Sequence, residues 1–463
     1  SGAACPLGTA LSFTVAAYLW ARLGLRRSLR TALLLMLAGT LAGLAADHFF
    51  IMVLARFLQG TGGGLALVYG TGLVNAALPP ERRSPAMGVK LCSIGLASCA
   101  SPVAGCLLVQ YWHWKGLFVI VGAAAALLAV LTTLYVPNTK IPKNGKFDWF
   151  SFLTLAAGCV CILMVLIYGE TDGWTAPGVL CWMYGGFCSF VLAAISCMTH
   201  RTPLLDVRVL GNWRFLFGLL ASLCNIFCIC WVRVGTVQFM RNVMNYEPAG
   251  IAWVFLVLVA GFCAGAAIVL PLMQKGRLAL RVGMMAGLLG LGSSAFFLSR
   301  LDAGCSWLDV AWPLGLFGVG YAFCLNVATP LALRGVEAKS AAASSRTLNT
   351  VRYVFISMYV GSVSTVLAHM KTGYRFDMAE QVRDDSPGTV QTLDMWQRHF
   401  SETGGTAADI HASVNAMLNH AVALQSQVFS VDAFYLCTVI VGAAGVLFAL
   451  LCLKSGKERN TAS

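Results

Sequence analysis

Charged side chains are scarce in this sequence. They make up 11% of its 463 residues, whereas 58% of the residues are hydrophobic. A soluble domain carries roughly a quarter of its residues as charged side chains, so a water-soluble fold is excluded. The apolar residues form runs of about 20, the length that crosses a hydrocarbon core of about 30 Å. Because backbone groups in lipid must bond within their own segment, we expect an all-α, polytopic membrane protein.

The usual signals of enzymes and metal sites are missing as well. The 17 Cys lie almost entirely inside apolar runs without a CxxC pair, and the 7 His are scattered. The sequence contains no phosphate loop, paired carboxylates or nucleophile beside a base. We therefore expect no enzyme activity, no metal and no cofactor. The net charge of +13 is dispersed in small clusters, which argues against a nucleic-acid partner.

Thirteen apolar runs are candidates for spans. They cover residues 6–21, 31–46, 50–78, 85–110, 116–136, 150–168, 177–199, 213–238, 249–273, 279–299, 308–332, 349–369 and 430–453. Most Lys and Arg lie in alternate connections, among them Arg22, Lys140 and Lys275. By the positive-inside rule these connections and the C-terminus are cytoplasmic, and the first residues are outside. This odd count, starting outside, is what we expect of an even-numbered bundle without its first helix.

Two short strings recur along the chain. LxxRxG occurs at 19–24 and 278–283, and Glu-x-x-Ser-x-Ala occurs at 81–86 and 337–342, with nearly equal offsets. A duplicated half-bundle of this kind is common in transporters. The repeat predicts a 6+2+6 plan with one helix absent. Its parts are an N-terminal half-bundle at 1–136, two linker helices at 137–212, and a C-terminal half-bundle at 213–463 with a long outer loop at 370–429.

Several strings resemble one transporter family. The segment 56–64 resembles the pattern RxxQGxGxG, 114–118 resembles WRxxF, and 203–208 resembles PLxDLR. All three are typical of the fourteen-span drug:proton antiporters of the EmrB/QacA type in the major facilitator superfamily. The resemblance implies a major facilitator fold and proton-coupled efflux of amphipathic drugs or toxic compounds across the inner (cytoplasmic) membrane. It also implies small-molecule substrates, protons and the lipid bilayer as partners, with a coupling carboxylate in the first helix.

Two other functions stay open at this point. The chain could export a specific metabolite or lipid precursor, which a ring of polar side chains in the cavity would favour. It could also be a truncated membrane protein that transports nothing.

Four residues are candidates for the transport cavity and for proton coupling. Arg56, Gln59 and Gly60 share one helix face, and an unpaired guanidinium inside a span is expensive unless it faces a polar interior. Arg233 lies inside a later span and could bind an anionic substrate group. The alternatives are that Arg56 reaches the outer interface and that Arg233 pairs with Glu247.

The antiporter signature GxxxGPxxGG is partly kept in the segment 97–106. Ser101, Pro102 and Gly105 are its candidate residues, and Pro102 would act as a hinge because proline removes a backbone donor. Cysteines at positions 92, 99 and 106 form a small-residue stripe on the same helix, which predicts a packing face.

Two cytoplasmic loops are candidates for gating. The first carries Arg22 and Gly24, and the second carries Arg281 and Gly283, both in the LxxRxG string. Ala21 stands where members of the superfamily often have Asp.

The remaining charged positions favour structural roles. Asp148, Asp309 and Asp432 lie at the ends of expected spans, where helix capping or solvation is expected. Arg352 begins a span on the cytoplasmic side, which favours anchoring at the interface.

An apolar stripe marks the second half of the outer loop. It consists of Ile410, Val414, Met417, Ala421, Leu424 and Val428, at steps of four and three. This spacing predicts a helix that runs into the last span. The stripe is expected to pack on the transporter's own outer surface, and docking to a periplasmic adaptor protein is the alternative.

Overall fold

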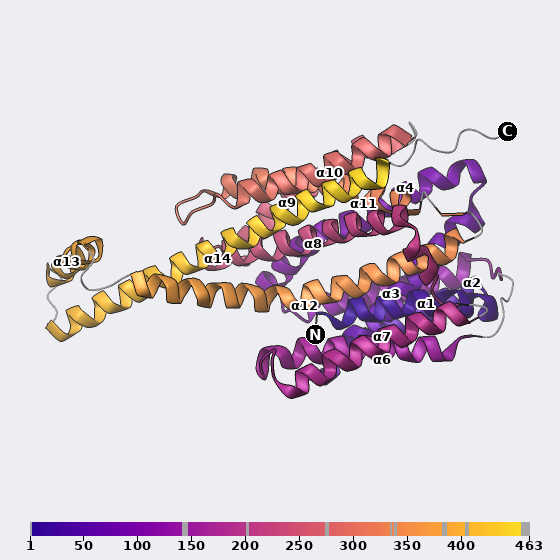
Figure 1. Ribbon diagram of the computed structural model, residues 1–463, viewed down its shortest axis with the longest axis horizontal. Helices are drawn as coiled ribbons and strands as arrows, with labels where there is room; N and C mark the ends of the chain where they lie inside the picture. The colour runs from indigo at the N-terminus through magenta and orange to yellow at the C-terminus, as the bar shows by residue number, and fades with distance from the viewer. Residues whose placement is uncertain are drawn as a thin grey trace.

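The computed structural model describes residues 2–140, 147–200, 203–273, 277–333, 336–337, 340–381, 387–402 and 407–454. All regular secondary structure in these ranges is helical, as the sequence predicts (Figure 1). The α-helices are α1 (Ala4–Leu23), α2 (Leu25–Leu44), α3 (Phe49–Ala77), α4 (Pro80–Tyr111), α5 (Gly116–Tyr135), α6 (Trp149–Thr171), α7 (Pro177–Thr199), α8 (Trp213–Asn242), α9 (Pro248–Met273), α10 (Arg277–Leu298), α11 (Trp307–Leu333), α12 (Ala341–Gln381), α13 (Pro387–Glu402) and α14 (Ala407–Lys454). A short 3-10 helix, η1 (Val207–Gly211), precedes α8.

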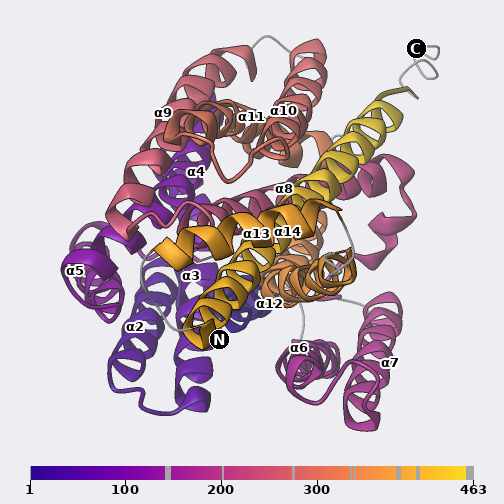
Figure 2. The same cartoon turned by 90° about the vertical axis from the view of Figure 1, so that its left-hand side faces the viewer.

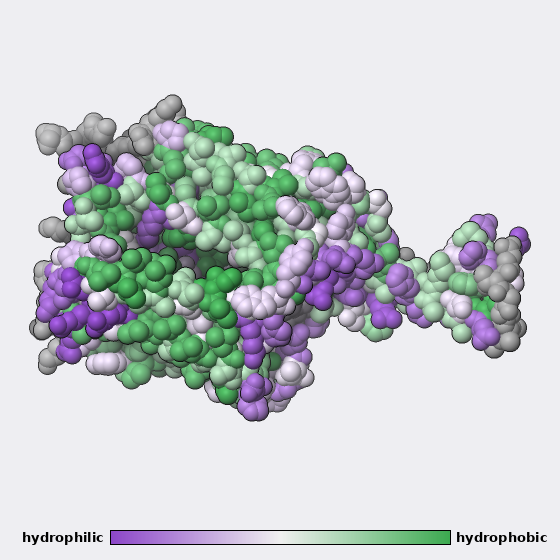
Figure 3. Space-filling view, turned by 180° about the vertical axis from the view of Figure 1, so that it is seen from behind, coloured by the Kyte–Doolittle hydropathy of each residue, from purple (hydrophilic) through white to green (hydrophobic). Residues whose placement is uncertain are grey.

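The expected spans coincide with these helices. Within the described residues, twelve helices are long and apolar enough to cross a membrane. The one remaining expected span, at 279–299, falls on α10, whose apolar stretch there is the shorter Val282–Leu298. In a space-filling view, hydrophobic residues cover the bundle between two more polar margins (Figure 3). This distribution agrees with a polytopic membrane protein.

The first helices pack closely because glycines remove side chains from their contacts. Helix α3 lies between α1 and α2, with Gly60 facing the backbone of α1 and Gly62 facing that of α2. A Cβ placed on Gly60 would lie 1.9 Å from the carbonyl oxygen of Cys5. Helices approach this closely only where one of them has no side chain.

A second group of helices holds the largest hydrophobic core. It consists of α8, α9, α10, α11 and α14. Helix α4 packs chiefly on α9 and α11, and it buries Cys99 in this core with Cys92 and Cys106 beside it. The cysteine stripe is therefore a packing face, as predicted. Helix α1 packs along α12, which itself packs on α8 and α14 of the second group. The division at 136 and 212 stays a prediction.

Helices α6 and α7 form a pair at one side of the bundle (Figure 2). Their neighbours are α1, α12 and η1. Leu7 and Leu11 of α1 share a small core with this pair and with the segment that leads to η1. The expected linker helices are thus two adjacent spans beside the bundle.

The connection at 370–429 is mostly helical in its described part. Helix α12 runs on to Gln381 and α14 begins at Ala407, so the two helices extend past the bundle, with α13 at their tip (Figure 1). The predicted helix that runs into the last span is confirmed. The stripe packs partly on the protein itself, because Val414 and Val428 are buried whereas Met417 is 43% exposed.

Candidate transport site between the helix groups

One arginine joins α8 to α4, a helix of the expected N-terminal half-bundle that packs chiefly on the second helix group. Arg233 of α8 donates from Nη1 to Ser98 Oγ at 3.0 Å and from Nη2 to Ser101 Oγ at 2.7 Å. Both serines belong to α4. Within the described residues, the backbones of α4 and α8 do not pack on each other, so the Arg233 side chain spans the space between them. The structure therefore brings together two residues that the sequence placed in separate candidate sets.

Pro102 explains why Ser101 is placed to receive this arginine. Proline has no N–H, so the carbonyl of Ser98, four residues earlier, loses its helical partner. The Ser101 hydroxyl replaces that partner, donating to the Ser98 carbonyl at 2.9 Å. Its lone pairs then face Arg233 Nη2. Ser98 was absent from the sequence prediction, although the proline rule points to it. Gly105, one turn further along, faces open space.

Two further polar contacts cross the same face of α4. Asn326 of α11 donates to Cys92 Sγ at 3.4 Å, and Gln110 donates to Glu247 Oε2 at 3.3 Å. Glu247 is thus engaged by α4, and the alternative in which it pairs with Arg233 is wrong. The face of α4 toward the second helix group thus carries both cysteines and hydrogen-bonding side chains.

Arg56 belongs to a separate network inside the first helix group. Its Nη1 donates to Gln59 Oε1 at 3.3 Å, and its guanidinium carbon lies 4.3 Å from the centre of the Phe118 ring. Gln59 in turn donates to Thr40 Oγ1 at 3.0 Å. The arginine is half-buried among α2, α3 and α5. A side chain at Gly60 would collide with the backbone of α1, whereas a Cβ at Gly63 would meet nothing within 4 Å.

The first candidate gating loop is held by the segment after α5. Gly24 ends α1 with φ of 84°, a left-handed conformation that favours glycine. Leu25 N and Trp20 Nε1 both donate to the carbonyl of Thr139, at 2.8 and 3.0 Å. Arg22 lies over the Tyr18 ring at 4.7 Å. This loop is therefore tied to residues more than a hundred positions away.

The second gating loop differs from the first in its local structure. Gly283 lies inside α10, where a Cβ would meet Val327 Cγ2 at 3.2 Å, so it serves helix packing. The side chain of Arg281 lies outside the described residues. The LxxRxG repeat consequently marks a helix break in one copy and a helix interior in the other.

Arg352 is buried, contrary to the expected interfacial anchor. Its side chain is 8% exposed and donates from Nη1 to Thr329 Oγ1 of α11 at 2.7 Å. Nε and Nη2 have no hydrogen-bond partner among the described residues. Its position near the start of the expected span suggested the interface, but α12 begins earlier, at Ala341, and turns this side chain toward α11.

The three carboxylates at expected span ends have different environments. Asp148 caps α6 by accepting from Ser151 N at 3.0 Å, and Asp309 accepts from Ser306 N at 2.8 Å, as predicted. Asp432 does not cap a helix, because α14 is continuous from Ala407. Its Oδ1 is buried without a hydrogen-bond partner among the described residues.

The family of this chain follows from its sequence as a whole. Residues 2–359 match the model of the Major Facilitator Superfamily. The chain belongs to this superfamily. This major facilitator is also similar to proteins named for drug resistance. It is 27% identical over 366 residues to the multidrug resistance protein Stp of Mycobacterium tuberculosis, covering 78% of this chain and 67% of that protein.

In two further relatives the match covers a smaller share of the relative's own length. The putative multidrug resistance protein MdtD of Klebsiella pneumoniae is 26% identical over 67% of this chain and 65% of its own. The probable actinorhodin transporter of Streptomyces coelicolor is 23% identical over 68% of this chain and 56% of its own. These names agree with the drug:proton antiporter branch that the motifs resemble.

Solved structures share the fold of this major facilitator. A POT family transporter in complex with 5-aminolevulinic acid superposes with a TM-score of 0.60 at 14% identity, covering 98% of this chain and 87% of that one. A bacterial homolog of the lysosomal transporter Spinster gives 0.55 at 16% identity, covering 98% and 90%. At these identities the likeness concerns the fold alone. The protein is thus a membrane transporter by family and not an enzyme.

Proposed function

We propose that this protein exports amphipathic compounds from the cytoplasm across the inner (cytoplasmic) membrane in exchange for protons, with its C-terminus in the cytoplasm. The observation that carries this proposal is the Arg233 bridge to Ser98 and Ser101. Alternating access requires two helix groups joined by contacts that can break and reform. Two serine hydroxyls bind a guanidinium without a full ion pair, so the bridge holds the groups together reversibly.

Each candidate residue has a role in this proposal. Arg233 lines the substrate path, and Pro102 with Gly105 lets α4 bend as the Arg233 contact opens. Arg56, Gln59 and Gly60 position α3 beside the path. The loop with Arg22 and Gly24 and the start of α10, with Arg281 and Gly283, close the cytoplasmic side.

Asp432 is our candidate for the proton-carrying group among the described residues. The adjacent Tyr435 of the same helix shares a hydrogen bond of 2.9 Å with Thr236 of α8. The nearby titratable groups are Asp302 and Cys305, in the connection between α10 and α11, and Tyr435. None of these is cationic, and a buried carboxyl oxygen without a donor favours the neutral acid. Proton uptake here would therefore neutralise a charge at the outer part of α14.

Transport in proteoliposomes tests the proposal. Purified protein is reconstituted, a pH gradient is imposed, and movement of the lipophilic cation ethidium is followed by fluorescence. We expect gradient-driven ethidium transport that Arg233→Ala strongly reduces. Arg300→Ala is the matched control, because Arg300 is exposed just beyond the end of α10 and its guanidinium lies over the Phe296 ring at 5.1 Å. Unchanged transport by Arg233→Ala would contradict the proposal, and no transport of any tested cation would favour a membrane protein without transport activity.

Export of one lipophilic metabolite is the second candidate function. The similarity to a probable actinorhodin transporter favours it. Structurally unrelated cations added to the ethidium assay distinguish the two functions. They should compete with ethidium in a multidrug exporter and should not compete in an exporter of one metabolite.

A periplasmic adaptor is a further proposed partner. The exposed part of the α14 stripe, including Met417, would form its contact. If an adaptor co-purified equally well after Met417 and its exposed neighbours were replaced, this surface would not be its contact.

A further inference from the structure

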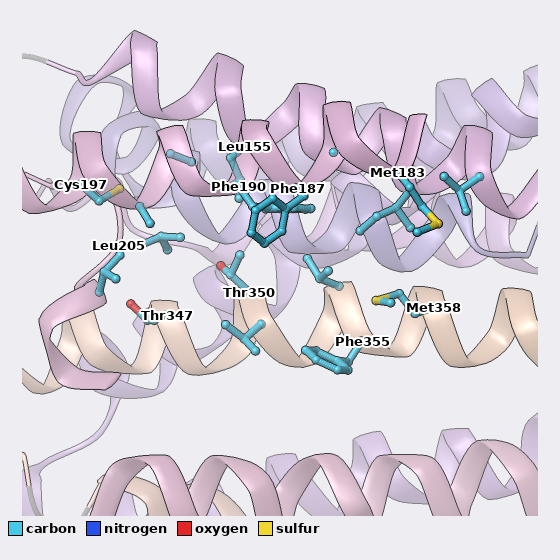
Figure 4. A pocket seen from close by; sticks show the side chains of 18 of the residues that line it. Leu155, Met183, Phe187, Phe190, Cys197, Leu205, Thr347, Thr350, Phe355 and Met358 are labelled. Carbon is cyan, nitrogen blue, oxygen red and sulfur yellow. The ribbon is translucent and has the colours of Figure 1, made fainter. Parts of the chain in front are cut away.

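A large cavity separates the linker pair from the bundle. It has a volume of about 810 Å³ and lies between α6 and α7 on one side and α12 with η1 on the other (Figure 4). Along α12 its lining extends from Thr347 to Ser362. At 1.5 Å per residue this is about 22 Å, a large part of the thickness of a hydrocarbon core. The cavity is therefore a long slot parallel to the helices.

The lining offers little to a polar ligand. Aromatic, aliphatic and methionine side chains dominate it, including Phe187, Phe190, Phe355 and Met358. Two of its few hydroxyl groups are engaged within the protein: Thr347 donates to the Asp206 carbonyl and Ser151 donates to Asp148. A ligand for this slot must therefore be apolar along its length.

The slot opens toward the surroundings of the bundle. Phe187 and Met183 of α7 are 68% and 48% exposed although they line the cavity. Helix α7 is apolar enough to cross a membrane, so the medium at this opening is lipid. An empty space of this size would forfeit the dispersion contacts of its walls, so an acyl chain from the bilayer is the natural filling.

The two ends of the slot differ in charge. At the end formed by η1 and the first turns of α12, Arg208 follows the lining residue Val207, and Arg346 precedes Thr347. Arg208 is exposed. At the opposite end the lining includes Trp174 and Trp182. Cationic side chains beside the mouth of an apolar slot suit a phosphate headgroup, and tryptophans suit the other membrane interface.

We propose that this slot binds a membrane phospholipid, with one acyl chain between α7 and α12 and its phosphate beside Arg208. The bound chain joins the linker pair to α12. It also gives a role to the PLxDLR segment, whose Leu204 and Leu205 line the slot and whose arginine meets the headgroup. This proposal is independent of the substrate and of proton coupling.

Photo-crosslinking in the full-length chain tests the proposal. A benzophenone amino acid replaces Phe190 in the slot or Leu192 on the opposite, exposed face of α7. The protein is extracted, washed extensively in detergent to remove exchangeable lipid, irradiated and analysed by intact-protein mass spectrometry. We expect a phospholipid adduct at position 190 and at least about tenfold less at position 192, because only the slot buries a whole acyl chain.

Two variants sharpen the assignment. Ala194→Trp fills the slot and should remove the adduct at position 190, whereas Ala194→Ser should keep it. Arg208→Gln should lower the share of phosphatidylglycerol over phosphatidylcholine in the adduct when both are supplied. Equal adducts at positions 190 and 192, or crosslinks from position 190 to α12 alone, would overturn the proposal. These outcomes hold even if Ala194→Trp fails to fold, since they need only the two benzophenone proteins.

Discussion

Arg233 Nη2 lies 2.7 Å from Ser101 Oγ, although 132 positions separate the two residues in the chain. The contact joins α8 to α4 immediately before the proline of the antiporter signature. The Arg233 guanidinium, the Ser101 hydroxyl and the Ser98 carbonyl thus form one chain of hydrogen bonds. The Ser98 carbonyl is available because Pro102 has no N–H to donate to it. Changes to any of the three should affect transport together.

Loss of the two serine acceptors should weaken the bridge. In Ser98→Ala/Ser101→Ala the guanidinium loses both acceptors, and hydrogen bonds to charged groups contribute about 1.5–3 kcal/mol each. We expect ethidium transport to fall by about tenfold or more. A double-mutant cycle with Arg233→Ala measures the coupling. Additive effects of the serine and arginine changes would show that the bridge has no role in transport.

Replacement of Pro102 should stiffen α4. Pro102→Ala restores a backbone N–H to the Ser98 carbonyl and releases the Ser101 hydroxyl from it. We expect a higher melting temperature in detergent together with slower transport. Pro85→Ala is the matched control, because Pro85 lies in the first turns of the same helix. Slower transport in both variants would point to general stiffness of α4 instead of the Ser98–Ser101–Arg233 arrangement.

Two glycines of α3 should differ sharply in their tolerance of a methyl group. A Cβ on Gly60 collides with the backbone of Cys5, whereas a Cβ on Gly63 meets nothing within 4 Å. We expect Gly60→Ala to destabilise the protein by about 1–3 kcal/mol, as overpacking does, and Gly63→Ala to be neutral or slightly stabilising. Thermal unfolding of the detergent-solubilised protein makes the comparison. Equal melting temperatures would mean that α1 and α3 are farther apart in the membrane.

Asp432 should be needed for coupling but not for substrate exchange. Asp432→Asn keeps the shape of the side chain and cannot carry a proton, so stimulation by a pH gradient should disappear while exchange of labelled against unlabelled substrate at equal pH continues. Asp309→Asn is the control, because Asp309 is an exposed helix cap. Gradient-driven transport by Asp432→Asn would rule out this carboxylate as the coupling group.

The sequence alone determined the helices and the family. The apolar runs coincide with the observed helices because each span must satisfy its backbone within itself, which makes span position a local property. The capping roles of Asp148 and Asp309 were likewise readable, since a cap acts within three residues. Strings such as the one at 56–64 pointed to the superfamily.

Only the tertiary structure decided the partners of the charged residues. Arg233 could have paired with Glu247, and the choice of Ser98 and Ser101 depends on how α8 is placed relative to α4. Gly60 and Gly63 have the same intrinsic freedom, but α1 approaches one and not the other. Asp432 looked like a helix end because the residues before it are polar. It lies inside α14, because the helix that the apolar stripe predicts continues into the last span without a break, so no helix end falls at this residue.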